Sequence, residues 1–208
     1  EEEGRQHPML SFLHEMKPKK DFFAGLSDSP VAQMSDQEFL QAKATYFGLM
    51  TEIDEQLGRI FDYLKSADQY DSTLIVFTSD HGEQLGDHYL FGKLGYFDAS
   101  YHIPLIIRDP KRQLQNVKTL EHFSESVDVM PTILDWLGLE IPDQCDGRSL
   151  LPFLENEVPR NWREEVHSEF DFRWIGSYQP MIEERFGLLP DECSLVIVRD
   201  DDYKYVHM

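Results

Sequence analysis

The chain has 208 residues, which is enough for one domain with a sizeable hydrophobic core. Its formal net charge is −20, from 39 acidic and 19 basic residues, and this excess argues against nucleic-acid binding, which requires a basic surface. No apolar run reaches the roughly 18–20 residues of a membrane-spanning helix, and two cysteines are too few for a disulfide framework. We therefore predict a protein of a reducing, cytoplasmic compartment that binds neither nucleic acid nor membrane.

The ends of the chain predict that it is part of a longer protein. It begins at Glu1 without an initiator methionine, and it ends at Met208 within what reads as an interrupted strand. Residues 1–34 carry mixed charge and a Ser/Pro-containing stretch, which is typical of loops. Within them we predict only a short helix, from about Met9 to Glu15.

A long amphipathic helix is predicted from about residue 36 to residue 66. Ser35 and Glu38 form the pattern of a capping box, and the helix contains no proline. Apolar residues recur in it at helical spacing, namely Phe39, Ala42, Tyr46, Leu49, Ile53, Leu57, Ile60, Phe61 and Leu64. We expect this apolar stripe to pack against a sheet as part of the core rather than to bind a cofactor.

A central strand is predicted at residues 73–79, with the sequence TLIVFTS. Such a continuous apolar and β-branched run indicates a buried strand of a parallel sheet that is covered on both faces. A glycine-containing loop of about twenty residues follows, and a loop of that length in a compact domain is usually functional. A second strand is predicted at 103–108, and a helix at 125–137 with Asp128 as its N-cap.

The C-terminal part of the chain has the pattern of an antiparallel sheet. Residues 166–170 and 195–199 read as strands, and residues 203–207 are expected to pair back as a hairpin. Because strands and helices alternate before this point, we predict an α/β sandwich with a mostly parallel central sheet and helices on both faces. The antiparallel portion would follow it.

A carboxylate and an imidazole stand where the central strand ends. Asp80 and His81 follow the strand directly, and open α/β sheets place their chemistry at the carboxyl ends of strands. Neighbouring strand side chains point to opposite faces, so the backbone must turn for both to reach one target, and Gly82 permits such a turn. An oxygen and a nitrogen ligand suit Mn²⁺ or Zn²⁺ better than Ca²⁺. The two residues by themselves are equally compatible with an aspartate N-cap beside a surface histidine.

A series of segments resembles the C-terminal catalytic segment of the sulfatases. The segments are SDHGE at 79–83, LGDH at 85–88, Gly92-Lys93, IPLIIRDP at 103–110, SVDVMPT at 126–132 and CDGRSL at 145–150. The pattern is most similar to that of the phosphonate monoester hydrolases, which belong to the alkaline phosphatase superfamily. A single Asp-His-Gly would be weak evidence for the family, whereas this series of segments in this order is specific for it.

The resemblance implies a hydrolase of phosphonate monoesters, phosphodiesters or sulfate esters, and hence a small anionic ester as substrate. Asp80 and His81 would be ligands of a divalent metal, with Mn²⁺ or Zn²⁺ preferred. Lys93 would be the catalytic charge stabiliser that contacts the oxygens of the transferred group. The nucleophile would be a formylglycine upstream of this chain, because the chain has no Cys/Ser-x-Pro-x-Arg and Cys145 lacks the required proline. We expect this segment alone to be inactive.

The resemblance also implies an alkaline-phosphatase-like fold and a homo-oligomer. Either the first 35 residues or the long helix would supply the oligomer interface. We therefore predict three parts: a loop-rich segment at 1–34 with a role in oligomerisation, the C-terminal part of an α/β catalytic domain at 35–165, and the start of an antiparallel subdomain at 166–208.

Two other functions stay open at this stage. One is a phosphodiesterase or phosphomutase of the same superfamily, with a Ser or Thr nucleophile and two metals; the other is a catalytically inactive acidic scaffold. The upstream nucleophile sequence would separate them. Within the loop, we consider Glu83 as an acceptor that orients His81, and we interpret His88 as a structural residue.

Overall fold

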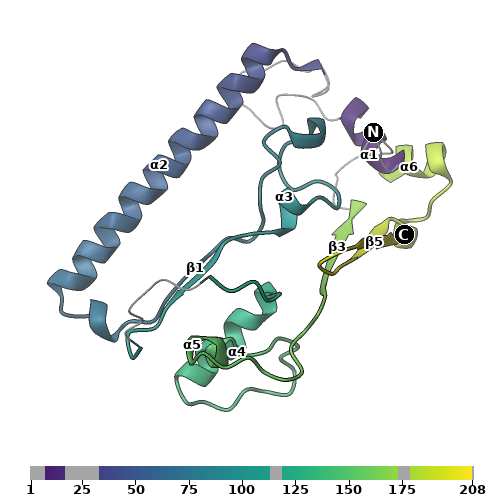
Figure 1. The fold of residues 1–208 in the computed structure, drawn as a ribbon. Helices are drawn as coiled ribbons and strands as arrows, with labels where there is room; N and C mark the ends of the chain where they lie inside the picture. The colour runs from purple at the N-terminus through teal and green to yellow at the C-terminus, as the bar shows by residue number, and fades with distance from the viewer. Residues whose placement is uncertain (1–7, 17–32, 113–118, 173–178, 208) are drawn as a thin grey trace. The chain divides into compact units, whose positions relative to one another are not determined.

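The computed structural model of the chain describes residues 8–16, 33–112, 119–172 and 179–207 (Figure 1). It divides into two compact units, Glu1–Ile107 and Arg108–Met208, and each is described here by itself. The three predicted parts, with boundaries after residues 34 and 165, stay a prediction.

The first unit contains the two helices that the sequence predicts. Helix α1 (Pro8–Met16) confirms the short helix, and its side chains Met9, Leu10 and Phe12 are buried. Helix α2 (Asp36–Ser66) runs unbroken over its whole length (Figure 1). Its capping box is present, because the Ser35 hydroxyl accepts the Glu38 N–H while the Glu38 carboxylate accepts the Ser35 N–H at 2.8 Å.

Within the described residues, no helix combines the length and apolar character needed to cross a membrane.

The apolar stripe of α2 differs from the prediction. Ala42 is its only buried residue, and Phe91 packs against it. Leu49, Ile53 and Ile60 are more than half exposed, so the expectation of a core-packed stripe is wrong for them in this structure. The physical reason is the size of the sheet, because the described residues give it only two strands, which is too little surface to cover a helix of 31 residues.

The two strands of the first unit are β1 (Ile75–Thr78) and β2 (Leu105–Arg108), and they pair in one sheet. Between them lie two short helices, η4 (Asp87–Tyr89) and α3 (Asp98–Tyr101), and η3 (Tyr70–Ser72) precedes β1. Both predicted strands are confirmed in place. Burial on both faces is not, since Phe77 in β1 and Ile106 in β2 are exposed. The described residues place β1 and β2 in a two-stranded sheet, which does not by itself show the predicted parallel central sheet.

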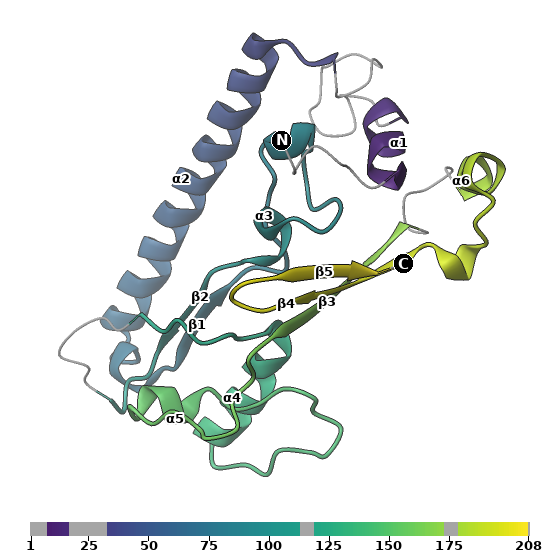
Figure 2. The ribbon, with the colours of Figure 1, turned by 45° about the vertical axis from the view of Figure 1, so that its right-hand side comes forward.

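The second unit confirms the predicted antiparallel portion. Strands β3 (Val166–Asp171), β4 (Ser194–Arg199) and β5 (Lys204–His207) form a sheet in the order β3-β4-β5 (Figure 2). Leu195 and Ile197 of β4 are buried, because alternate residues of the central strand point into the core. The helices of this unit are η5 (Ser126–Asp128), α4 (Val129–Trp136), α5 (Leu151–Leu154), α6 (Gln179–Phe186) and η8 (Pro190–Glu192).

Asp128 holds the second unit together from a fully buried position. It stands at the predicted N-cap of α4, but its carboxylate makes no capping bond to that helix. Instead Oδ1 accepts the Arg148 N–H (2.8 Å) and Arg163 Nη2 (2.7 Å), while Oδ2 accepts the Glu125 N–H (2.8 Å) and Arg163 Nη1. The hydrogen bonds that Arg163 donates to the Asp128 carboxylate raise the pKa of Arg163, so the guanidinium stays charged. One carboxylate thus joins three separate segments.

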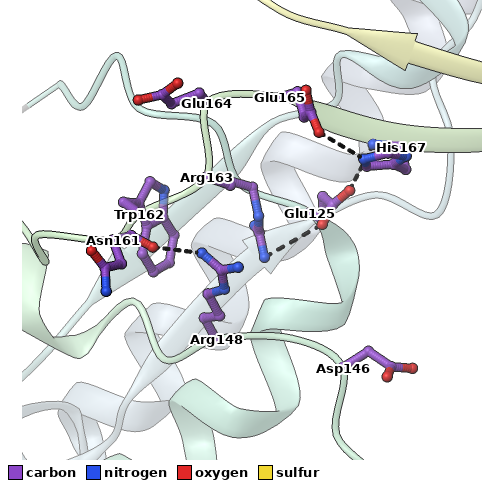
Figure 3. A pocket seen from close by; sticks show the side chains of 9 residues that line it. All are labelled: Glu125, Asp146, Arg148, Asn161, Trp162, Arg163, Glu164, Glu165 and His167. Atoms are coloured by element: carbon purple, nitrogen blue, oxygen red, sulfur yellow. Dashed lines mark hydrogen bonds and ion pairs between the residues drawn. The ribbon is translucent and has the colours of Figure 1, made fainter.

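Three partners of Asp128, namely Glu125, Arg148 and Arg163, also line a cavity of about 430 Å³ (Figure 3). Arg163 reaches Glu125 at 3.3 Å, Glu125 accepts the His167 N–H at 2.8 Å, and Arg148 donates to the Asn161 carbonyl at 2.9 Å. Because both guanidinium groups are already bound to protein oxygens, we interpret this cavity as a feature of packing in the second unit.

A second buried carboxylate makes the stability of this unit depend on pH. Burial of Asp109 would raise its pKa, but hydrogen bonds from Trp136 Nε1 (2.8 Å) and the Lys111 N–H (2.9 Å), and its pairing with Arg112, outweigh this and lower it. The unfolded chain then binds a proton at a pH where the folded chain does not. The stabilisation is fully present above the unfolded pKa of about 3.9 and is lost as pH falls through the lower folded pKa.

We therefore expect Asp109→Asn to reduce the loss of stability of the intact protein between pH 7 and pH 3. The measurement is the urea midpoint of unfolding at each pH. Asp143→Asn, at an exposed position of the same unit, is the matched control and should leave the pH dependence unchanged. An Asp109→Asn variant with the original acid sensitivity would show that this carboxylate does not carry it.

Candidate active site

The carboxylate and imidazole of the predicted metal site lie side by side just after β1. The chain bends at both Asp80 and His81, as is needed for the two side chains to point to the same place. His81 Nε2 lies 3.6 Å from Asp80 Oδ2, and His81 Nδ1 lies 2.8 Å from the Gly82 carbonyl oxygen. Because a carbonyl oxygen only accepts, Nδ1 must carry the proton in that hydrogen bond. In the neutral imidazole, Nε2 is then left with a lone pair directed to the same region as the Asp80 carboxylate.

Gly82 is required at this place because the backbone packs closely there. A Cβ on Gly82 would lie 2.0 Å from the carbonyl oxygen of Ala99, in the helix α3. The Gly82 N–H also donates to the carbonyl of Ser100 at 2.9 Å. Any side chain would therefore push the end of β1 away from α3 and displace the neighbouring Asp80 and His81.

Lys93 is an exposed side chain on the loop after η4, next to Gly92, which has a positive φ of 73°. Its charge acts on Asp80. Partial desolvation would raise the pKa of Asp80, but the charge of His81, the backbone N–H groups of Asp80 and His81, and the charge of Lys93 outweigh this and lower it. The carboxylate is therefore ionised at neutral pH. The structure thus pairs Asp80 with His81, and the positive charge of Lys93 acts on the same carboxylate.

Two further loop residues have roles that the structure makes plain. Glu83 Oε1 accepts the Gly92 N–H at 2.7 Å and the Leu85 N–H at 3.0 Å. The expectation that Glu83 orients His81 is therefore wrong, because the Gly82 carbonyl does so. His88 stacks on Phe97 with ring centroids 3.8 Å apart, which supports its interpretation as a structural residue.

The donors present fit a divalent metal as a partial set. Asp80 contributes an oxygen and His81 a nitrogen, and the hydrogen bond at Nδ1 fixes the imidazole as an outer partner commonly does for a ligating histidine. Within the described residues, no group of three or more His, Cys, Asp or Glu comes together as a metal site.

The cysteines take no part in this arrangement. Cys145 is half-buried and Cys193 is buried, and neither forms a disulfide within the described residues. Cys193 Sγ lies 3.2 Å from the Leu189 carbonyl oxygen. None of the three site residues lines the cavity of the second unit.

Comparison with known families decides where the chain belongs. Residues 3–139, which is more than half of the chain, match the sequence model described as Sulfatase. The chain belongs to the sulfatase family. Residues 86–207 also match a model described as N-sulphoglucosamine sulphohydrolase, C-terminal, in agreement with the predicted C-terminal portion of a sulfatase.

Among sulfatase relatives, the chain is 51% identical over 205 residues to the multifunctional alkaline phosphatase superfamily protein PehA of Trinickia caryophylli, covering 99% of this chain and 39% of that protein. It is 37% identical to an arylsulfatase of Clostridium perfringens, covering 79% of this chain and 37% of that protein. The chain thus spans about two fifths of the length of the curated relatives it matches.

Solved structures show the same relationship. The fold matches a phosphonate monoester hydrolase of Agrobacterium radiobacter with a TM-score of 0.88 at 42% identity, covering 97% of this chain and 40% of that one. It matches the phosphonate monoester hydrolase SpPMH of Silicibacter pomeroyi with a TM-score of 0.84 at 40% identity, covering 97% and 39%. The α/β fold and the family expected from the motifs are therefore confirmed.

Proposed function

We propose that this chain is part of a metal-dependent hydrolase of anionic esters, in which Asp80 and His81 bind the metal and Lys93 stabilises charge on the reacting group. Phosphonate monoesters are the substrates we favour, with phosphodiesters and sulfate esters as the other members of the class. Two solved structures that match 97% of this chain with TM-scores of 0.88 and 0.84 are phosphonate monoester hydrolases, and this similarity supports the order.

One observation carries the proposal. A carboxylate with a lowered pKa and an imidazole whose Nδ1 is bound to the Gly82 carbonyl face each other at 3.6 Å. When His81 is neutral, its Nε2 and the Asp80 carboxylate present electron pairs to the same region, and a bound cation would stabilise this arrangement. A nitrogen ligand favours Mn²⁺ or Zn²⁺ over Ca²⁺.

The role of Lys93 follows from charge. The ester substrate carries a negative group to a chain whose formal net charge is −20, so local positive charge favours its binding. Lys93 is exposed, and its ammonium group offers three N–H donors to the oxygens of that group. The hydrogen bonds from these donors would become stronger as negative charge develops on those oxygens in the transition state.

Groups outside this chain complete the proposed site. A bound divalent metal would withdraw charge from the ester and activate a nucleophile, which in sulfatases is expected to be a formylglycine encoded upstream. This chain contributes the ligand pair, the lysine and the loop that carries it. We also propose that the whole protein is a homo-oligomer.

The ligand assignment is tested by metal analysis of the intact protein. We expect His81→Ala to lower the amount of Mn²⁺ or Zn²⁺ bound per chain at least about tenfold when the metal concentration is limiting. The substitution removes a direct ligand, and loss of a residue that only hydrogen-bonds to a ligand already lowers metal affinity about 10–100-fold. His167→Ala, an exposed histidine of the second unit, is the matched control and should keep its metal. Full occupancy in His81→Ala would remove this residue from the site.

The substrate class is tested by the rates of the intact protein on an aryl phosphonate monoester and an aryl sulfate. We expect the phosphonate monoester to have the higher kcat/KM. A higher value for the sulfate would move the proposal to the arylsulfatases while leaving the ligand assignment in place.

A further inference from the structure

Glu83 and Gln84 bind the loop on both sides of Lys93. The Glu83 carboxylate accepts the N–H of Gly92 at 2.7 Å, and the main-chain N–H of Gln84 donates to the Gly92 carbonyl at 3.0 Å. The Gln84 side-chain Nε2 donates to the Leu94 carbonyl at 2.8 Å. Gly92 and Leu94 are the residues before and after Lys93, so these hydrogen bonds hold the backbone that carries the lysine.

The same glutamine reaches the segment that holds the ligand pair. Gln84 is 1% exposed, and its Nε2 also donates to Ser100 Oγ at 2.9 Å. The Ser100 carbonyl in turn accepts the N–H of Gly82, the residue directly after the ligand pair. Tyr101 adds a further bond, from its hydroxyl to the Gly95 carbonyl at 3.0 Å, and burial raises the pKa of Tyr101 to about 12, which keeps the hydroxyl a donor.

The Gln84 amide makes these bonds although one of its own atoms is left without a partner. Its Oε1 is buried and accepts no hydrogen bond within the described residues. A buried polar atom of this kind is destabilising, and an apolar side chain of similar length would avoid that cost. What the glutamine contributes at this position is therefore the pair of N–H donors on Nε2, and not packing alone.

We propose that Glu83 and Gln84 are positioning residues that set Lys93 at a fixed place relative to Asp80 and His81. This inference deepens the proposed function and rests on it, because it takes Lys93 to act on the reacting group. The exposed lysine has a long, flexible side chain, so its reach is reproducible only where its backbone is held. A misplacement of about 1 Å can cost about 100-fold in rate.

A double-mutant cycle on the intact protein tests this inference. Gln84→Met keeps the length of the side chain and removes its donors, while Glu83→Ala removes the acceptor for the loop. We expect each to lower kcat for an aryl phosphonate monoester about 10–100-fold with bound metal unchanged. Glu83→Gln keeps an acceptor oxygen and should retain most of the activity.

The decisive comparison is the same pair of substitutions in a Lys93→Ala background. If Glu83 and Gln84 act through Lys93, their further effect there is expected to fall to about twofold or less, because the positioned group is gone. Equal effects in both backgrounds would overturn the inference. If Lys93→Ala by itself left kcat unchanged, the proposed role of Lys93 would fail, and the inference with it.

A matched control lies on the same loop. Asp87 carries an exposed carboxylate three residues beyond Gln84, and Asp87→Ala should leave kcat unchanged. A loss as large as that of Glu83→Ala would show that any missing carboxylate on this loop has the same effect, and would overturn the specific role of Glu83.

Discussion

Lys93→Ala is expected to lower kcat for an aryl phosphonate monoester by about 10²–10³-fold, the usual cost of removing one donor to developing negative charge. The effect should fall on kcat and kcat/KM alike, because the contact strengthens in the transition state. Steady-state kinetics of the intact protein measure it. Bound metal should be unchanged, since Lys93 is not a ligand.

Two companion variants sharpen this result. Lys93→Arg keeps the charge but replaces a compact ammonium by a planar guanidinium, so we expect only part of the rate to return. Lys65→Ala removes an exposed lysine of α2 that pairs with Asp62 at 3.9 Å, and should leave kcat unchanged. A Lys93→Ala enzyme as active as Lys65→Ala would contradict the role of Lys93 in charge stabilisation.

The second large effect is expected in stability. Arg163→Ala should lower the free energy of unfolding by about 3–5 kcal/mol, because it leaves the buried Asp128 carboxylate without its charged partner. The measurement is urea unfolding of the intact protein at neutral pH. Arg160→Ala, an exposed arginine nearby in the chain, is the control and should change stability by no more than about 0.5 kcal/mol.

Replacing both Asp128 and Arg163 separates the contribution of their ion pair to stability from that of the other hydrogen bonds of Asp128. A buried ion pair can often be exchanged for apolar residues at little cost. Asp128 also accepts the main-chain N–H groups of Glu125 and Arg148, and these would be left unpaired. We therefore expect Asp128→Leu combined with Arg163→Met to recover only part of the lost stability. Full recovery would contradict the role of the carboxylate as a junction between segments.

Much of the local structure could be read from the chain. The capping box at Ser35 and the absence of proline predicted the start and length of α2, and both are observed. The strands β3, β4 and β5 lie within a residue of the predicted segments 166–170, 195–199 and 203–207. Such features depend on residues within a few positions of one another, so they are visible in sequence.

The partners of individual polar side chains could not be read in the same way. Glu83 was expected to orient His81 but binds Gly92, nine residues away, and no sequence signal marked Gln84 at all. Asp128 was recognised as a helix start, but its pairing with Arg163 spans 35 residues. Contacts of this kind depend on how loops fold back, which periodicity does not encode.

The amino-acid sequence by itself determined the sulfatase family, the order of the elements and the three residues proposed for chemistry, because short motifs keep their residue types and spacing. Only the tertiary structure decided how those residues are held. The Gly82 carbonyl orients His81, the close approach of Ala99 excludes a side chain at residue 82, and Glu83 and Gln84 bind the backbone around Lys93. These are hydrogen bonds and van der Waals contacts between chain segments, and they exist only once the loop between β1 and β2 has folded.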